Sequence, residues 1–371
     1  MLSKEDLKNN RIIGCSGLRQ IPYTLGQAVK NAEVSVFEAT EEKDGEIQVV
    51  AVKRIKLWGM RRKDELRVAR ECRILQGLDH PNILKFKAAY YVTSEDSICL
   101  VTTPWAPVTL LHFIEDIDQS NMSPKCPWFS FGSLSPLLHI MRRLMEGLEY
   151  LHTLEIPIKH KDIKAENILL RESTSTPFVE PIIIDFGISK EVIPSMDTTD
   201  IYTYTYRPPE QAQKQPTTTK SDVFCLGCVF TMIEGIMLDG QNGGRIVYGK
   251  ATQGSACFAD NLGLIHHFLD NQVSNLSLGN SLSSSDFNTV TFHIELRKLV
   301  KEMVERSPYR RPDITSALNR FVYIETFLGP NEAYPNTIIA QTSKSTLRGK
   351  TKEIQEEFKR KVREKALGLD A

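Results

Sequence analysis

The sequence predicts an α+β protein with two lobes, a smaller one built mainly of strands and a larger one built mainly of helices. Strand-like runs follow one another from residue 21 to 55, whereas most helical patterns lie beyond residue 108. Between the two patterns, residues 103–107 read Thr-Pro-Trp-Ala-Pro, and the two prolines stiffen this short connector. We therefore expect a hinge there.

The smaller lobe is expected to contain a five-stranded antiparallel sheet and one helix. The strand-like runs cover residues 23–29, 33–39, 47–55, 83–92 and 97–102. Strong helix formers with apolar residues at helical spacing predict a helix over 61–78. Ala51 and Lys53 share one face of the third strand because strand side chains alternate with period two. Glu71 falls within the helix.

The larger lobe is expected to be mainly helical. Apolar residues at helical spacing predict helices over 110–117, 137–154, 220–235, 292–304 and 314–321. The helix over 220–235 is too apolar for a surface element, so we expect it to cross the core. Two segments, 118–134 and 239–286, show no clear period, and we expect an exposed insertion and an irregular region there.

Two polar segments of the larger lobe contain the residue types that phosphate chemistry requires. Residues 160–170 read His-Lys-Asp-Ile-Lys-Ala-Glu-Asn-Ile-Leu-Leu and hold Asp162, Lys164 and Asn167 at fixed offsets before an apolar strand. A carboxylate can accept a proton, an ammonium can hold a phosphate oxygen, and an amide oxygen can bind Mg²⁺. Asp185 ends another apolar strand, where a carboxylate must be paired or metal-bound. The sequence predicts a phosphoryl-transfer site.

Composition narrows the functional class and the compartment. The 46 basic and 46 acidic residues balance, so nothing favours nucleic acid or an anionic membrane as a partner. Seven cysteines without repeated spacing argue against a secreted disulfide framework, and Cys225 and Cys228 are expected in the core rather than as a redox pair. Residues 1–11 are polar, and no run reaches the roughly 18 apolar residues of a membrane span. We expect a soluble, cytoplasmic protein, and a nuclear location is also compatible.

Four motifs occur in an order that resembles the eukaryotic protein kinase family over roughly residues 21–325. They are Val-Ala-Val-Lys at 50–53, His-Lys-Asp at 160–162 with Asn167, Asp-Phe-Gly at 185–187, and Pro-Pro-Glu at 208–210. Lys164, two residues after Asp162, is similar to the serine/threonine branch. The resemblance implies the bilobal protein kinase fold, with an extension at 1–20, an N-lobe at 21–102, a hinge at 103–107, a C-lobe at 108–328 and a tail at 329–371.

The resemblance also implies a role for each matching residue. Lys53, paired with Glu71, would hold the α- and β-phosphates of ATP. Asp162 would orient and deprotonate the substrate hydroxyl, and Lys164 would neutralise the γ-phosphate. Asn167 and Asp185 would bind Mg²⁺. The adenine would contact Val36, Ala51 and Leu169, with Thr102 as the gatekeeper and the backbone of Thr103 and Trp105 as the hinge contact.

Supporting contacts follow from the same resemblance. Glu210 and Arg311 resemble the family's buried ion pair, Asp222 the acid that braces the catalytic loop, and Thr203 the loop threonine of the serine/threonine branch. An apolar column that aligns the lobes would consist of Leu75, Phe86, His160 and Phe186.

The main departure from the family is the loop that covers the phosphates. The family expects Gly-x-Gly-x-x-Gly, whereas this chain has Val29, Asn31 and Val34, with Gly26 as the nearest glycine. Glycines let backbone amides approach phosphates without interference from a Cβ atom, so we expect weak nucleotide binding. Lys161 replaces the usual arginine and cannot form a bidentate phosphate pair, so we expect weak control by loop phosphorylation.

Two functions remain open at this point. The first is a protein kinase that transfers the γ-phosphate of Mg-ATP to serine or threonine hydroxyls of protein substrates. The second is a pseudokinase or kinase-like scaffold, which the loop without glycines favours. The presence of Lys53, Asp162, Asn167 and Asp185 together favours the first.

Two further segments have alternative interpretations. In the loop over 188–206, Ser195, Thr198 and Thr199 are expected to be ordinary loop residues rather than phosphorylation sites. In the tail, residues 350–367 carry Ile354, Phe358 and Val362 every four residues, which predicts an amphipathic helix. This helix either packs on the kinase lobe or docks a partner, and its balanced charges favour packing.

Overall fold

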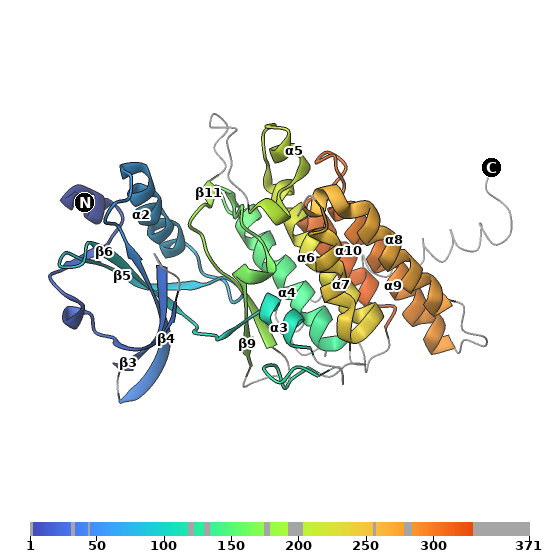
Figure 1. Ribbon diagram of the computed structural model, residues 1–371, viewed down its shortest axis with the longest axis horizontal. Coiled ribbons are helices and arrows are strands. Elements are labelled where there is room, and N and C mark those ends of the chain that lie inside the picture. The colour runs from blue at the N-terminus through green and yellow to red at the C-terminus, as the bar shows by residue number, and fades with distance from the viewer. Residues whose placement is uncertain are drawn as a thin grey trace.

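The computed structural model describes residues 3–30, 34–43, 45–117, 122–129, 134–173, 179–191, 203–254, 257–277 and 284–328. The chain forms two lobes, with the strand-rich N-lobe in blue at one end and the helical C-lobe in green to red at the other (Figure 1). This arrangement confirms the α+β, two-lobed prediction. The tail helix predicted over 350–367 lies outside the described residues, as do Ser195, Thr198 and Thr199.

The N-lobe contains a six-stranded sheet in the order β1-β5-β6-β4-β3-β2. Its strands are β1 (Ile13–Cys15), β2 (Thr24–Lys30), β3 (Val34–Lys43), β4 (Glu46–Lys56), β5 (Lys85–Val92) and β6 (Ser97–Thr103). Five of them pair antiparallel, as predicted. The prediction of only five strands is wrong, because β1 joins the edge in parallel with β5. A strand of three residues is too short to display the alternation by which strands are recognised.

Gly26 lies where the pairing of β2 with β3 shifts register, between Leu25 and Ala28. A Cβ atom at this position would lie 3.0 Å from the backbone oxygen of Glu38 on β3. That separation is shorter than ordinary van der Waals contact, so only glycine fits without movement of the strand. The close approach of two strands therefore explains this glycine.

Helix α2 (Arg62–Gln76), which the sequence predicts over 61–78, packs on the sheet. Ala69, Cys72 and Leu75 are buried in the core that α2 shares with the sheet. With these residues in the core, the Glu71 side chain reaches Lys53 of β4. The N-lobe also contains helix α1 (Lys4–Asn9) and a short 3₁₀ turn, η1 (Leu18–Gln20).

The C-lobe is mainly helical. Its helices are α3 (Leu110–Asp116), α4 (Ser135–Thr153), α5 (Pro209–Ala212), α6 (Thr219–Asp239), α7 (Gly243–Ala251), α8 (Phe258–Ser277), α9 (Ser284–Met303) and α10 (Ile314–Glu325). Its short strands are β7 (Val108–Thr109), β8 (Ile158–Lys159), β9 (Ile168–Glu172), β10 (Val179–Ile183) and β11 (Lys190–Glu191). The 3₁₀ turns are η2 (Ala165–Asn167), η3 (Tyr204–Tyr206) and η4 (Gly240–Asn242).

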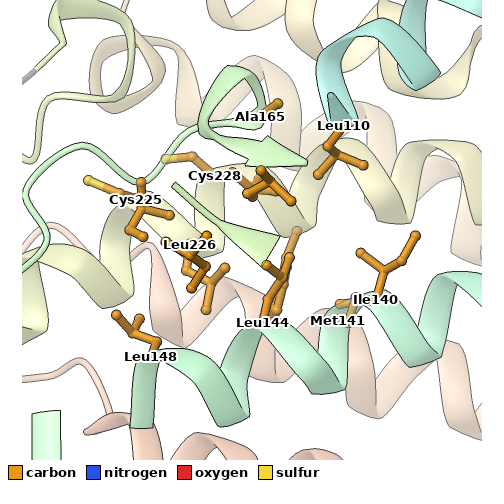
Figure 2. Packing of buried hydrophobic residues seen from close by; sticks show 14 of the residues in the cluster. Leu110, Ile140, Met141, Leu144, Leu148, Ala165, Cys225, Leu226 and Cys228 are labelled. Carbon is orange, nitrogen blue, oxygen red and sulfur yellow. The ribbon is translucent and has the colours of Figure 1, made fainter. Parts of the chain in front are cut away.

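Helix α6 is the core helix that the sequence predicts, buried from Ser221 to Met237. Figure 2 shows Cys225, Leu226 and Cys228 of α6 beside Leu144 and Leu148 of α4. Both cysteines are free thiols, and burial raises their pKa well above the ordinary value, so the prediction of core residues is confirmed. By length and composition α6 is the single helix in the described part of the chain that can cross a membrane, but it is packed inside the C-lobe.

The prediction of an irregular region over 239–286 is wrong, because most of it forms α7 and α8. Two of its glycines, Gly243 and Gly244, serve helix packing rather than loops. A Cβ atom on Gly235 of α6 would lie 2.5 Å from the backbone oxygen of Gly243 of α7, so the two backbones touch. In a sequence, a glycine that allows close packing of two helices looks the same as a glycine in a turn. The glycines of this region are therefore interpreted from the sequence as loop residues.

The segment over 118–134 is not wholly exposed. Within its described residues, Cys126 and Phe129 are buried, and the Phe129 ring packs edge-on against Phe113 of α3 with 4.9 Å between ring centroids. Trp128 also lies 5.1 Å from Phe113. Two aromatic side chains thus attach an aperiodic segment to the C-lobe, which periodicity does not reveal.

Candidate active site

The segment between β8 and β9 is held by a carboxylate of the core helix. The two oxygens of Asp222 on α6 accept hydrogen bonds from the backbone N–H groups of His160 and Lys161, each at 2.8 Å. Lys161 has a φ of 71°, which is unfavourable for a residue with a side chain. The two bonds compensate for this conformation, and the role predicted for Asp222 is confirmed.

His160 supports this segment from inside the C-lobe. Its Nε2 lies 2.9 Å from the Ile184 carbonyl oxygen, and its Nδ1 accepts the backbone N–H of Asp162 at 3.2 Å. Complete burial lowers the pKa of His160, so the ring is neutral with its proton on Nε2. The ring also packs edge-on against Phe186, 4.7 Å between centroids. His160 is a structural residue, as the sequence indicates.

Asp162 is the centre of a group of polar side chains. Its Oδ2 lies 2.7 Å from the Asn167 amide nitrogen and 2.9 Å from the Lys164 ammonium. Its Oδ1 accepts a hydrogen bond from the Thr203 hydroxyl, and Lys164 donates to that same hydroxyl at 2.8 Å. The three residues that the sequence places together thus converge on one point, with Thr203 of the following loop.

A second charged group joins the two lobes. Lys53 of β4 lies 2.9 Å from a Glu71 oxygen and 3.1 Å from Oδ1 of Asp185, which directly follows Ile184 after β10. Burial alone would lower the pKa of Lys53, but the two carboxylates raise it above the ordinary value. Burial likewise would raise the pKa of Asp185, and Lys53 more than offsets this, so its pKa is lowered. Burial raises the pKa of Glu71, although Lys53 opposes this rise. The contact between Lys53 and Asp185 is thus between charged groups at neutral pH.

The two charged groups lie next to each other. The backbone N–H of Ile184 donates to the Asn167 carbonyl oxygen at 3.0 Å. Asn167 is therefore bonded to the residue that directly precedes Asp185. The Asn167 amide nitrogen is engaged with Asp162, so its side-chain oxygen is the atom suited to a metal. A carboxylate and an amide oxygen fit Mg²⁺, which takes one or two protein ligands and completes its shell with phosphates and water. Within the described ranges, no cluster of three or more His, Cys, Asp or Glu suits a metal.

The residues predicted to hold adenine lie on strands around the connector. Val36 of β3 pairs with Lys53, and Ala51 of β4 pairs with Thr102 of β6. Leu169 of β9 pairs with Thr109 of β7 and is half-buried between two buried neighbours. Thr103 ends β6, and Trp105 follows in the connector, partly exposed. Of the phosphate-covering hairpin, Lys30 pairs with Ser35, and Asn31 lies outside the described residues.

A cavity of about 90 Å³ lies beside the ion pair, between α2 and the residues that follow Asp185. Four cationic side chains line it, namely Arg67, Arg70, Lys161 and Lys190, together with Glu71 and Phe186. Sequence patterns did not identify Arg67 and Arg70 as site residues. They lie on the same helix as Glu71, four residues and one residue before it, respectively. Lys161 is therefore one of several cations here rather than a single replacement for an arginine.

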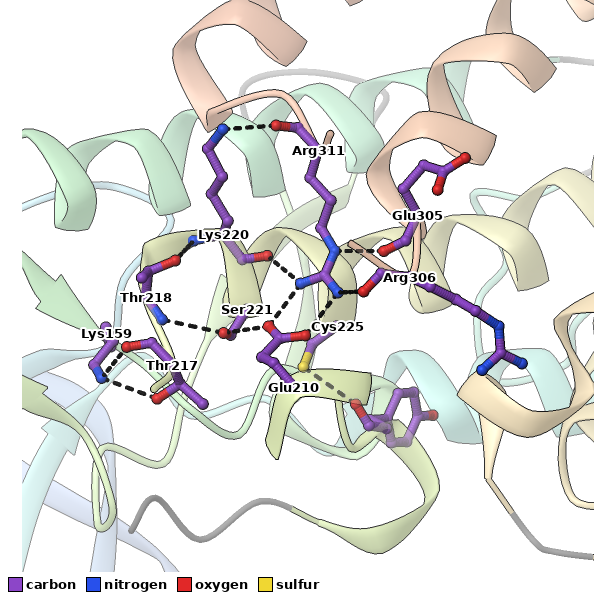
Figure 3. Close-up of polar contacts among 11 residues, drawn as sticks. Lys159, Glu210, Thr217, Thr218, Lys220, Ser221, Cys225, Glu305, Arg306 and Arg311 are labelled. Carbon is purple, nitrogen blue, oxygen red and sulfur yellow. Dashed lines mark hydrogen bonds and ion pairs between the residues drawn. The ribbon is translucent and has the colours of Figure 1, made fainter. Parts of the chain in front are cut away.

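The predicted buried ion pair is confirmed at the start of α6 (Figure 3). Both terminal nitrogens of Arg311 bind Glu210, each at 2.7 Å, and both residues are almost completely buried. Ser221 donates to Glu210 at 2.7 Å, and Arg311 also donates to the Glu305 and Arg306 carbonyl oxygens. The guanidinium lies 4.8 Å from the Phe224 ring centroid. This network ties α5 to α6 and to the segment between α9 and α10.

Comparison with known proteins gives a consistent match. Residues 31–322 match the protein kinase domain family. Similar proteins include cell division control protein 7 of Schizosaccharomyces pombe, 30% identical over 220 residues (58% of this chain and 18% of that protein), and probable serine/threonine-protein kinase samkA of Dictyostelium discoideum, 27% identical over 220 residues (57% and 30%). Serine/threonine-protein kinase Nek8 of Danio rerio is 27% identical over 282 residues (76% and 34%). The chain spans about a third or less of the length of each of these relatives.

Proposed function

The chain belongs to the protein kinase domain family, of the serine/threonine type, and from this premise we propose that it is an active enzyme. In this proposal it transfers the γ-phosphate of Mg-ATP to serine or threonine hydroxyls of protein substrates. The observation that supports this most strongly is the convergence of Lys164, Asn167 and Thr203 on Asp162. Asn167 is bonded through its backbone to Ile184, which precedes Asp185 of the Lys53–Glu71–Asp185 group.

The geometry suggests how the side chains divide the work. Mg-ATP, when bound, supplies the phosphoryl group and the charge that activates it. The Asp162 carboxylate is placed to accept the hydroxyl proton, while its bonds to Asn167 and Lys164 fix its orientation. Lys164 and Lys53 supply positive charge where negative charge develops on the phosphate oxygens. Asn167 and Asp185 would provide oxygen ligands for Mg²⁺.

The direct test is a transfer assay on the full chain. The purified protein is incubated with Mg²⁺, labelled ATP and casein, with and without EDTA. We expect label on phosphoserine or phosphothreonine in the sample without EDTA, and no label in the sample with EDTA. The absence of EDTA-sensitive label would support the alternative, a pseudokinase or scaffold, and label on tyrosine alone would contradict the proposed substrate class.

The Thr203 hydroxyl should be needed for full activity. A Thr203→Val variant loses the bonds to Asp162 and Lys164, and kcat should fall about tenfold or more, because a hydrogen bond to a charged group is worth about 1.5–3 kcal/mol. Thr203→Ser retains the hydroxyl and should stay close to the parent in a steady-state assay. Equal kcat for Thr203→Val and the parent would exclude a role for this contact.

Nucleotide affinity should be weak because the covering loop lacks glycines. At a Mg-ATP concentration equal to Kd, binding stabilises the folded chain by only about 0.4 kcal/mol. The thermal shift at millimolar Mg-ATP should therefore be smaller than that of a kinase with the full glycine pattern measured in parallel. An equally large shift would show that the side chains of this loop bind phosphate as well as glycines do.

Partners and compartment are part of the same proposal. The equal numbers of basic and acidic residues favour protein substrates over nucleic acid or membrane. We place the activity in the cytoplasm. The segment over 350–367 is a candidate docking element through its spaced apolar residues.

A further inference from the structure

Residues 3–15 lie along helix α2 and contact it at both ends. Asp6 of α1 forms an ion pair with Arg62, the first residue of α2. The side chain of Gln76, the last residue of α2, donates to the Asn10 carbonyl oxygen at 2.9 Å. A helix rises about 1.5 Å per residue, so the backbones of Arg62 and Gln76 are about 21 Å apart, whereas Asp6 and Asn10 are one helical turn apart, and the Asn10 N–H donates to the Asp6 carbonyl oxygen at 3.1 Å. The side chains at the two ends of α2 therefore reach the same short stretch of chain, and together they restrain the position of α2.

Apolar contacts connect the same segment to the core of the N-lobe. Ile12 is buried, and Leu7 packs against the cluster that contains Ala69 and Leu75 of α2. The backbone N–H of Ile12 donates to the Leu7 carbonyl oxygen at 2.8 Å, which closes the turn between α1 and β1. The segment is therefore folded onto α2 rather than joined to it by side-chain charges alone.

The sheet holds the other side of the segment. Strand β1 pairs in parallel with β5, with Ile13 opposite Tyr90 and Cys15 opposite Val92. Beyond the strand, the Thr93 N–H donates to the Cys15 carbonyl oxygen at 3.0 Å. Because β5 is part of the fixed sheet, β1 gives the segment a rigid base from which α1 reaches α2.

Hydrogen bonds within residues 3–15 orient the Asp6 carboxylate for its contact with α2. Its carboxylate accepts hydrogen bonds from the hydroxyl and the backbone N–H of Ser3, which precedes α1. The Ser3 hydroxyl and Arg62 lower the pKa of Asp6 to about 2. The carboxylate is therefore charged throughout the neutral pH range and is oriented before it meets Arg62.

The position of α2 decides whether Glu71 can reach Lys53. Glu71 lies between the two attachment points, and its contact with Lys53 spans 2.9 Å. Displacement of α2 by one or two ångströms breaks such a contact, and small misplacements of catalytic groups cost large factors in rate. We propose that residues 3–15 are a positioning element that holds α2 where Glu71 pairs with Lys53, and thereby regulate the activity proposed above, on which this inference rests.

The test removes the polar contacts at both ends of α2 without touching the site. In an Asp6→Asn/Gln76→Ala variant of the full chain, kcat at saturating Mg-ATP should fall roughly five- to tenfold, the lower range of coupling between distant sites. The matched control is Asp64→Asn, which removes the pairs of Asp64 with Arg61 and Arg67 at the start of α2, where Asp64 forms no hydrogen bond or ion pair with residues 3–15. The control should keep the parental kcat.

A second measurement separates positioning from general destabilisation. If residues 3–15 act through Glu71, the same double substitution introduced into a Glu71→Gln background should lower kcat no further. An additional five- to tenfold loss in that background would overturn the proposal. So would a parental kcat in the Asp6→Asn/Gln76→Ala variant.

A readout without catalysis distinguishes failure of this inference from failure of the proposed function. Amide hydrogen exchange over residues 62–76 should accelerate in the Asp6→Asn/Gln76→Ala variant, while exchange over α6 stays unchanged. If the parent transfers no phosphate but exchange in α2 responds in this way, the kinase activity is wrong and the positioning role stands. Unchanged exchange in α2 would overturn the positioning role whatever the activity.

Discussion

An Asp162→Asn variant is expected to lose roughly 10³-fold in kcat, within the range attributed to general acid–base catalysis. The substituted amide keeps the size of the carboxylate but cannot take the hydroxyl proton. It also cannot accept hydrogen bonds from Asn167, Lys164 and Thr203 on both of its terminal atoms, because one of them becomes a donor. The KM for ATP should change little, since Lys53 bonds Glu71 and Asp185 rather than Asp162.

The control for this experiment is an aspartate outside the site. Asp79 is exposed and pairs with Lys85 on the surface, so Asp79→Asn should keep parental activity. Both variants should melt within a few degrees of the parent, because neither change empties the core. Equal label transfer by Asp162→Asn and the parent would show that Asp162 is not the base and would favour the pseudokinase.

A Glu210→Ala variant is expected to lower the free energy of unfolding by about 3–5 kcal/mol, the usual effect of removing one partner of a buried ion pair. Arg311 would keep its charge in a site where its side chain is fully buried. Its bonds to the Glu305 and Arg306 carbonyl oxygens would remain, but two charge-assisted bonds would be lost. Urea denaturation of the full chain, followed by far-UV circular dichroism, measures the change.

Two further variants test the physical reason for this effect. Arg320→Ala removes a pair with Glu302 that lies near the surface, and such pairs contribute only about 0–1 kcal/mol. A Glu210→Leu/Arg311→Met variant replaces both charges by apolar groups and should be more stable than Glu210→Ala, because no unpaired charge is left buried. If Glu210→Ala costs no more than Arg320→Ala, the buried pair is not a major source of stability.

Much of the fold was predictable because the chain contains long periodic segments. The helix over 137–154 and the core helix over 220–235 were recognisable from apolar spacing, and α4 and α6 are found there. The polar site was predictable for a different reason. Asp162, Lys164 and Asn167 are close in sequence, so a short loop brings them together whatever surrounds it.

The missed features depend on contacts that sequence patterns do not record. Strand β1 exists because the edge of β5 provides partners for three residues. Helix α7 begins with a glycine, Gly243, because α6 approaches it closely at Gly235. Arg67 and Arg70 gain their place beside Lys161 only when α2 packs next to the residues after Asp185. In each case a tertiary contact outweighs the local preference.

The attachment of the segment between β8 and β9 to Asp222 has a consequence for how the candidate site is lost on unfolding. One side chain of the buried helix α6 binds two consecutive backbone amides of the segment, so the segment cannot open locally while α6 remains folded. The segment therefore belongs to the same cooperative unfolding unit as the C-lobe core, whereas residues 3–15 and α2 belong to the N-lobe. Mild stress is thus expected to lower the rate through movement of α2, while the arrangement around Asp162 survives until the C-lobe itself unfolds.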